Sequence, residues 1–295
     1  MCIRDSPEEA YKMIGDAFEY SEKYNTPVLF RPTTRVCHAY ASIDNCDSPS
    51  PKKYEGFVKD SKKWVIFPRL SFANHIMIEK RNVEIGKDFS TYSANKAEGR
   101  NSEKAVVTSG ISYAYTKECL KDYPDVKLIK IATAYPFPED FVLSSLEGTK
   151  EVLCIEELSP FIEEQILKLT GKHGLQLKVS GKLDGKVQAG GENSTDKIAA
   201  ILGEFLGKDF TAEGYDLSDA PALPVRPPVL CAGCPHRASF YAVKQAMKGR
   251  KAYFCGDIGC YTLGNAMPLD MVDTCLCMGA GITMAQGFNL SLIHI

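Results

Sequence analysis

The segment LCAGCPHRASF holds the densest group of chemically capable side chains in this sequence. Two residues separate Cys231 from Cys234, and His236 and Arg237 follow shortly after. A CxxC pair can bind zinc, act as a redox dithiol at a helix start, or supply two ligands of an iron–sulfur cluster. Haem attachment needs a histidine directly after the second cysteine, and Pro235 stands there instead. The spacing excludes haem and leaves the other chemistries open, together with a plain turn.

More than half of the cysteines lie in the C-terminal part of the chain. The chain has 11 cysteines, and this stretch contains Cys231, Cys234, Cys255, Cys260, Cys275 and Cys277. Scattered buried cysteines would not cluster in this way. No basic segment followed by an apolar run opens the sequence, so we expect no secretory signal and reduced thiols in the cytoplasm.

Two glycine-rich loops follow the cysteine pair. GDIGC comes directly after an expected strand, and MGAGIT stands at an expected helix start. Glycines let the backbone approach a phosphate closely, and both tight turns and helix N-termini favour anions. Ordinary tight turns are the plainer interpretation of either loop alone. The candidate cofactor contacts are His236, Arg237, Gly256, Asp257, Ile258, Gly259, Cys260, Gly279 and Ala280.

Bulk composition limits the class of protein. The 295 residues suffice for two ordinary domains, and 44% hydrophobic residues is typical of a globular chain. The formal net charge of −2 argues against a nucleic-acid-binding surface. No apolar run approaches the roughly 20 residues that a membrane helix needs.

The elements that must position these residues alternate between strand and helix. The pattern predicts a strand with a glycine turn at 104–110 and strands at 126–135, 150–157 and 175–181. It predicts helices at 111–123, 138–148 and 160–174. This order predicts an α/β fold with a doubly wound, mostly parallel sheet. Ligands gather at the carboxyl ends of such strands, where Thr108-Ser109-Gly110 and Glu156-Glu157 would lie. A turn and a solvated helix start are the plainer interpretation of these two groups.

The regions around this core are less regular. We expect a helix at 7–24, a strand at 26–36, a polar connector at 43–61, and a helix with an exposed loop within 64–104. A proline-rich linker at 216–230 precedes a helix at 237–247 and a strand at 251–255.

The two ends of the chain show an unusual relationship. MCIRDS can be encoded by a DNA string whose reverse complement reads LSLIHI, and the string looks like a sequencing adapter. We therefore expect residues 1–6 and 290–295 to be adapter scars and the chain to be an internal fragment.

The motifs resemble those of a known family. PPVLCAGCPHRASFYAVK, GDIGCYTLG and DTCLCMGAGITMAQG resemble the thiamine-diphosphate domain of the indolepyruvate:ferredoxin oxidoreductase large (alpha) subunits, within the 2-oxoacid:ferredoxin oxidoreductases. SEKYNTPVLFRPTTRVCH and VVTSGISYAYTKE resemble earlier parts of the same subunits, in the same order. The resemblance covers nearly all of residues 7–289.

The resemblance implies an enzyme with several doubly wound domains of the thiamine-diphosphate type. It would oxidatively decarboxylate aryl 2-oxoacids such as indolepyruvate to acyl-coenzyme A, with ferredoxin as electron acceptor. Thiamine diphosphate, Mg²⁺ and a [4Fe-4S] cluster are the implied cofactors, and a small (beta) subunit is the implied partner. Carried over, Cys231, Cys234 and Cys260 would ligate the cluster, and its fourth ligand would be expected beyond Asn289. The GDIGC and MGAGI backbones would face the diphosphate.

The resemblance also implies a domain division. Residues 7–43 would end a pyrimidine-type domain, 44–103 would connect, 104–215 would form a transketolase-C-terminal-like domain, and 216–289 would begin the diphosphate-binding domain. Nucleic acid and membrane are not expected partners.

Several family features are missing from this sequence. The acidic magnesium motif expected after MGAGI is absent, the activating glutamate is expected before Pro7, and MGAGI replaces the usual MGASI. We therefore expect the chain alone not to turn over substrate. The competing interpretations are a related 2-oxoacid oxidoreductase or thiamine decarboxylase with another substrate, and a zinc-stabilised structural or interaction module.

Overall fold

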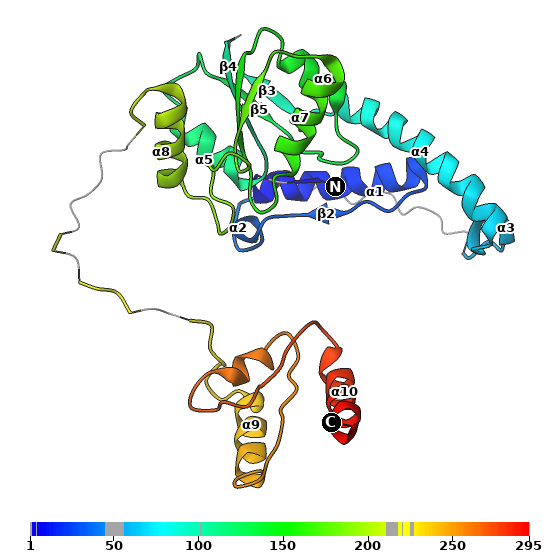
Figure 1. The fold of residues 1–295 in the computed structure, drawn as a ribbon, viewed down its shortest axis with the longest axis vertical. Helices are drawn as coiled ribbons and strands as arrows, with labels where there is room; N and C mark the ends of the chain where they lie inside the picture. The colour runs from blue at the N-terminus through cyan, green and yellow to red at the C-terminus, as the bar shows by residue number, and fades with distance from the viewer. Residues whose placement is uncertain are drawn as a thin grey trace. The chain divides into compact units, whose positions relative to one another are not determined.

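The chain forms two compact units, residues Met1–Gly214 and Tyr215–Ile295. The computed structural model describes residues 2–3, 5–44, 56–100, 102–210, 218–219, 221–224 and 227–294. Residues 45–55 of the expected connector and residues 216–217, 220 and 225–226 of the expected linker lie outside these ranges. Each unit is described by itself (Figure 1).

A five-stranded sheet forms the centre of the first unit, in the order β3-β5-β4-β6-β7. Its strands are β3 (Lys96–Glu98), β4 (Lys104–Thr108), β5 (Lys127–Lys130), β6 (Glu151–Ile155) and β7 (Lys178–Ser180). The last four run parallel, and β3 runs antiparallel to β5. Val106 of β4 stands opposite Leu128 of β5 and Leu153 of β6. The expected α/β fold with a mostly parallel sheet is confirmed.

Helices cover both faces of this sheet, as the apolar runs in the strands require. They are α5 (Ile111–Cys119), α6 (Glu139–Ser145), α7 (Phe161–His173) and α8 (Thr195–Leu206). On one face α5 and α8 pack on alternate strand residues such as Val106 and Leu153. On the other face α6 and α7 pack on Val107 and Cys154. The alternation of buried side chains therefore builds two cores, one on each face.

The N-terminal segment packs on the same unit. Its elements are β1 (Cys2–Ile3), α1 (Pro7–Tyr24), β2 (Phe30–Arg31), α2 (Thr34–Cys37), α3 (Ser61–Trp64) and α4 (Pro68–Ser90). The predicted helix at 7–24 is confirmed, and the Ser6 side chain caps it by accepting from the Glu9 amide at 3.2 Å. The strand predicted at 26–36 was too long. Pro32 has no amide proton for a strand ladder, and α2 begins two residues later.

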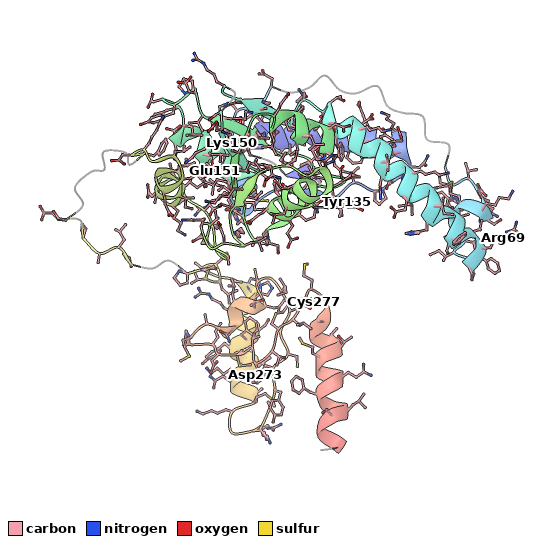
Figure 2. All side chains as sticks on the ribbon, turned by 45° about the horizontal axis from the view of Figure 1, so that its top comes forward. Arg69, Tyr135, Lys150, Glu151, Asp273 and Cys277 are labelled. Atoms are coloured by element: carbon pink, nitrogen blue, oxygen red, sulfur yellow. The ribbon has the colours of Figure 1, made fainter. Side chains whose placement is uncertain are left out.

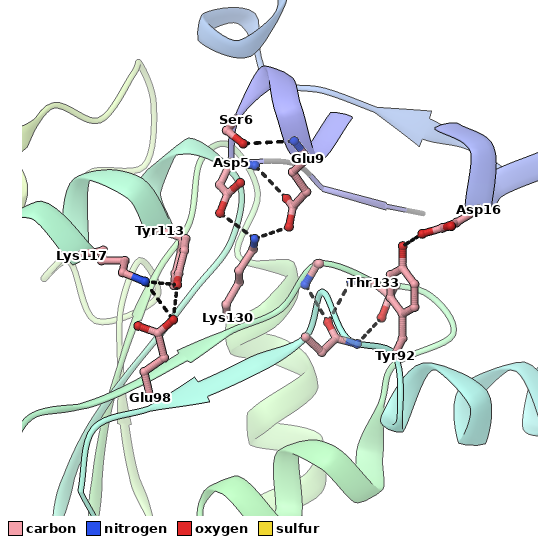
Figure 3. A network of polar contacts seen from close by, with 12 residues as sticks. Asp5, Ser6, Glu9, Asp16, Tyr92, Glu98, Tyr113, Lys117, Lys130 and Thr133 are labelled. Carbon is pink, nitrogen blue, oxygen red and sulfur yellow. Dashed lines mark hydrogen bonds and ion pairs between the residues drawn. The ribbon is translucent and has the colours of Figure 1, made fainter. Parts of the chain in front are cut away.

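Two buried polar groups join this segment to the sheet (Figure 3). The Lys130 side chain is 1% exposed, forms an ion pair with Glu9 of α1, and lies 4.8 Å from the Tyr113 ring centre. Asp5, which belongs to the expected adapter scar, also contacts the Lys130 ammonium, at 2.6 Å. The side-chain oxygen Oδ1 of Asn95 accepts from the Ala132 amide at 2.7 Å. Charge and hydrogen bonds therefore fix α1 and β3 at one edge of the sheet.

The second unit has little regular strand structure. It contains α9 (Pro235–Ala246), the 3-10 helix η1 (Thr262–Asn265) and α10 (Ala280–His294). The strand expected at 251–255 is reduced to one parallel bridge between Cys255 and Thr274. Within the described ranges, no helix of either unit has the length and apolar character needed to cross a membrane.

Candidate functional site

Asp257 connects the two glycine-rich loops. Both of its carboxylate oxygens lie 2.9 Å from the Gly279 amide nitrogen, and Oδ1 also accepts from the Ile258 amide at 2.8 Å. Gly279 immediately precedes α10. The carboxylate therefore lies at a helix N-terminus, where free amides and the helix dipole favour negative charge. The structure brings together two loops that the sequence places more than a dozen residues apart.

The loops approach each other closely because both are glycine-rich. A Cβ atom at Gly281 would lie 2.9 Å from the Gly256 carbonyl oxygen, which is shorter than real Cβ contacts. A Cβ atom at Gly256 would lie 2.6 Å from Cγ1 of Val272. The backbone contact with residue 256 thus requires glycine at 281, and the contact with Val272 requires glycine at 256.

Two further glycines leave their backbone open. Gly259 has φ +123° and Gly279 has φ +84°, and a Cβ atom at either would meet nothing within 4 Å. Open space therefore lies beside the backbone at each of these two glycines. The Gly279 amide already donates to the Asp257 carboxylate. This carboxylate lies where an external anion would accept the same hydrogen bond. The donor set therefore fits a diphosphate, provided that Asp257 releases the amide.

The cysteine pair forms a turn at the start of α9. The Cys234 amide donates to the Cys231 carbonyl at 3.3 Å, and Gly233 between them has φ +68°. Cys234 is the N-cap residue of α9, and its sulfur lies 3.3 Å from Nδ1 of His236. The Arg237 guanidinium donates to the Leu230 carbonyl oxygen, so this side chain holds the end of the linker against α9.

His236 links the cysteine pair to the GDIGC loop. Its ring lies edge-on to the Tyr261 ring, with 5.0 Å between the ring centres. Tyr261 directly follows Cys260, the third expected cluster ligand. The structure thus places the two motifs in one neighbourhood of the second unit.

The thiols themselves do not converge. Cys231 and Cys260 are exposed and Cys234 is half-buried. Within the described part of the chain, no three histidine, cysteine or acidic side chains lie close enough to hold a metal ion. The assignment of Cys231, Cys234 and Cys260 as cluster ligands therefore stays a prediction.

Comparison with known proteins identifies relatives of the chain. No protein-family model matches it. The indolepyruvate oxidoreductase subunit IorA of Thermococcus kodakarensis is 34% identical over 301 residues, covering 97% of this chain and 46% of that protein. The IorA subunit of Methanothermobacter thermautotrophicus is 35% identical, covering 96% and 47%. By sequence, this chain is a relative of the IorA subunits. It spans just under half the length of these IorA proteins.

Two solved structures show a weaker likeness to this IorA relative. A split-gene transketolase, described as an inactive beta4 tetramer, has a TM-score of 0.30 and 14% identity over 39% of this chain and 42% of its own. The 2-oxoglutarate:ferredoxin oxidoreductase of Magnetococcus marinus, solved with 2-oxoglutarate, coenzyme A and succinyl-CoA bound, has a TM-score of 0.34 and 14% identity, over 47% and 23%. Scores this low carry no argument about fold or function.

The carboxyl edge of the sheet in the first unit is a second polar site of this IorA relative. Thr108 ends β4 and Glu156 follows β6, as the strand pattern predicts. Glu156 is not a solvated helix start. It is 4% exposed, and its carboxylate accepts from the Ile162 and Glu163 amides at 2.9 and 3.0 Å. Burial raises the pKa of this carboxyl, against the two amide hydrogen bonds, which lower it.

The sequence analysis did not predict Arg31, the last residue of β2, or Thr33, which follows this strand; both line a cavity at the same edge. The polar run RPTTR, directly after an apolar stretch, could have indicated these two residues. The strand expected at 26–36 included this run.

Proposed function

We propose that the chain contributes the diphosphate side of the active site of a 2-oxoacid oxidoreductase that acts on aryl 2-oxoacids such as indolepyruvate. The observation that carries this proposal is the junction between Asp257 and Gly279. It joins the GDIGC and MGAGI loops at a helix N-terminus, beside glycines that no side chain covers. The relatives of this chain are named indolepyruvate oxidoreductase subunits.

The proposed cofactor is thiamine diphosphate, which supplies the nucleophilic carbon and the electron sink for decarboxylation when it is bound. The chain's own part is to bind and orient the diphosphate. The amides of residues 258–260 and of Gly279 would donate to phosphate oxygens. Asp257 would have to rotate away from both the Ile258 and the Gly279 amides. We assign no magnesium ligand in this chain.

The second proposed group is a [4Fe-4S] cluster on Cys231, Cys234 and Cys260. His236 supports this assignment because its Nδ1 lies in contact with the Cys234 sulfur and its ring touches the neighbour of Cys260. An imidazole N–H donated to a ligating sulfur would orient that thiolate. The exposed positions of Cys231 and Cys260 leave room for the turn to close on a cluster. Such thiols stay reduced in the cytoplasm, which is the proposed compartment.

The remaining partners follow from this function. A small (beta) subunit, ferredoxin, coenzyme A and the 2-oxoacid would each act on the complete enzyme. The chain spans just under half of its IorA relatives, so these partners are proposed for the whole protein.

Thiamine diphosphate binding tests the first part. Calorimetry on the 295-residue chain should show binding of thiamine diphosphate but not of thiamine, since the amides recognise the diphosphate. Gly279→Ala should abolish binding. Gly249→Ala is a matched control, because Gly249 has a similar positive φ of +76° and also meets nothing within 4 Å. Equal loss in both variants, or equal binding of thiamine, would refute the diphosphate site.

Anaerobic reconstitution with iron and sulfide tests the second part. A cluster gives broad brown absorbance, which Cys231→Ser and Cys260→Ser should remove and Cys37→Ser in the first unit should retain. A colourless protein with stoichiometric zinc would instead favour a zinc-stabilised module. We expect no 2-oxoacid-dependent reduction of viologen by the chain alone, and detectable turnover would contradict that expectation.

A further inference from the structure

The strands of the first unit create a crevice at one place on the sheet. β4 and β6 are parallel neighbours. The helix that follows β4 is α5, on one face, and the helix that follows β6 is α7, on the other. Adjacent parallel strands whose connections leave in opposite directions open a gap at their carboxyl ends, and ligands bind in such gaps. A cavity of about 740 Å³ opens here.

Three segments that are distant in sequence line the cavity. Residues 29 and 31–34 come from β2 and its surroundings, Ser109 follows β4, and residues 156–159 follow β6. All of them belong to the first unit. Tyr135, which follows β5 and is labelled in Figure 2, also borders the cavity.

Hydroxyl groups that make no hydrogen bond with the described residues lie in and beside the cavity. The hydroxyl oxygens of Thr33 and Thr108 are buried without a hydrogen-bond partner among the described residues. Ser109 is 6% exposed, and its hydroxyl makes no hydrogen bond within the described ranges. Buried polar groups are normally satisfied, and each exception calls for a ligand or another explanation. Thr33 and Ser109 line the cavity, so a ligand bound there can supply partners for their hydroxyls.

Some charged side chains of the cavity already have strong partners within the unit, and others form no ion pair. The Glu156 carboxylate is bound by two amides of α7, and Glu192 forms an ion pair with Arg35 at 2.8 Å. Arg31 and Glu157 differ from these. Neither makes an ion pair with any described residue, although Glu157 accepts one hydrogen bond from the Asn193 amide at 3.1 Å. One positive and one negative group that form no ion pair with a described residue thus line the same cavity.

An apolar wall completes the site. Leu29 and Leu158 line the cavity and are 71% and 54% exposed, and Phe161 lies beside them. Leu158 has φ +63°, a left-handed conformation that costs a branched residue energy. Glycine would adopt this backbone conformation without strain but would have no side chain to contact a ligand. Leucine at this position places a large apolar side chain at the cavity.

We propose that this cavity binds an α-amino acid with a large apolar side chain. Its carboxylate would pair with Arg31 and accept from the Ser109 hydroxyl, and its ammonium would pair with Glu157. Its side chain would lie against Leu158 and Phe161. A plain anion is disfavoured because three carboxylates line the cavity, and a plain amine would leave Arg31 without a counter-charge. This site belongs to the first unit and does not depend on the cofactor site proposed in the second.

Calorimetry with L-phenylalanine on the full 295-residue chain tests the proposal. Three matched compounds each lack one recognised part: 3-phenylpropionate has no ammonium, 2-phenylethylamine has no carboxylate, and L-alanine has no large side chain. Each should bind at least about tenfold more weakly, since a lost charged hydrogen bond or apolar contact costs this much. Equal binding of 3-phenylpropionate or 2-phenylethylamine would overturn the zwitterion assignment.

Variants separate the site from unspecific binding. Arg31→Gln and Glu157→Gln should each weaken L-phenylalanine binding at least about tenfold, and Leu158→Gly should weaken it while raising the thermal stability. Arg69→Gln is the matched control, because Arg69 is on α4, does not line the cavity and should leave affinity unchanged. Circular dichroism confirms folding of each variant. No binding by the wild type at millimolar ligand, or unchanged affinity in both Arg31→Gln and Glu157→Gln, would refute the site.

Discussion

The Asp257 carboxylate receives the Gly279 amide on both of its oxygens, each at 2.9 Å. Through this contact, Asp257 of the GDIGC loop caps α10, the helix that begins in the MGAGI loop. A carboxylate at a helix N-terminus stabilises the helix by about 1 kcal/mol. The same amide is a proposed contact of the cofactor diphosphate, so the intramolecular carboxylate and an external anion compete for one donor.

Removal of Asp257 should reveal that competition. Asp257→Ala should lower the free energy of unfolding of the second unit by about 1 kcal/mol. Inorganic pyrophosphate should raise the melting temperature of this variant more than that of the wild type, because the amide is already vacant. Differential scanning fluorimetry measures both effects. Asp122→Ala, an exposed change in the first unit, should show neither. A smaller pyrophosphate response in Asp257→Ala than in the wild type would contradict the shared donor.

Two glycines of α10 should respond in opposite ways to alanine. Gly281→Ala places a Cβ atom 2.9 Å from the Gly256 carbonyl oxygen, so it should destabilise the second unit by about 1–3 kcal/mol. Gly287→Ala meets nothing within 4 Å and should stabilise α10 by about 0.5–1 kcal/mol. Urea unfolding followed by helical circular dichroism distinguishes them. Destabilisation by both substitutions would show that the contact between the loops is not what limits residue 281.

The sequence was most informative where one pattern repeats over many residues. The helix at Pro7–Tyr24 has a cap, a proline at its start and regular apolar spacing, and its bounds were predicted. The strand-helix alternation after Lys104 was also predicted, because buried parallel strands are short apolar runs between glycine and polar turns. The same signals extend to α8 (Thr195–Leu206), which has a Ser194 cap and a buried stripe of Ile198 and Leu202. That helix could have been found and was missed.

Other features depend on contacts that no local pattern encodes. β3 has only Lys96, Ala97 and Glu98, and it is a strand because it pairs with β5. Asp257 was expected to face a diphosphate as part of a glycine turn, and its bond to Gly279 depends on the loops meeting in space. Lys130 looked like an ordinary strand lysine, and its burial depends on a carboxylate more than a hundred residues away.

The buried pair of Lys130 and Glu9 should be strongly coupled. Loss of one member leaves an uncompensated charge in a buried site, so Lys130→Met and Glu9→Gln should each cost about 3 kcal/mol. The double variant should cost less than the sum, because it leaves neither charge unpaired. Urea unfolding of the four proteins gives the coupling energy. The cycle is run in an Asp5→Ala background, since Asp5 also contacts Lys130. Additive losses would show that the pair does not hold α1 on the sheet.

The stability of the first unit should depend on pH through Glu156. Burial raises the pKa of this carboxyl above its ordinary 4.5, so the folded state holds the proton more tightly than the unfolded state. The resulting stabilisation is complete below the ordinary pKa and is lost as pH rises through the raised pKa. Compared with Glu156→Gln, the wild type should therefore lose stability as pH rises from 4.5, and then level off. Unfolding curves across this range measure the difference. A wild type that gains stability over the same interval would contradict the raised pKa.

Thiol labelling should separate the proposed cluster ligands from the other cysteines. In the chain without metal, the exposed Cys37, Cys231, Cys260 and Cys277 should react first with maleimide (Figure 2 labels Cys277). Cys154 should react only after unfolding, because it is 1% exposed and burial raises the pKa of its thiol well above the ordinary value.

Anaerobic loading with iron and sulfide should change this pattern at selected positions. Cys231 and Cys260 should become protected together with Cys234, while Cys37 and Cys277 should keep their reactivity, since only the first three are proposed ligands. Peptide mass spectrometry after labelling gives the modified fraction at each position. Zinc would protect the CxxC pair as well, so the absorbance of the same sample distinguishes the metals. Protection of Cys37 to the same extent as Cys231 would mean that the iron is bound without specificity, and the ligand assignment would then fail.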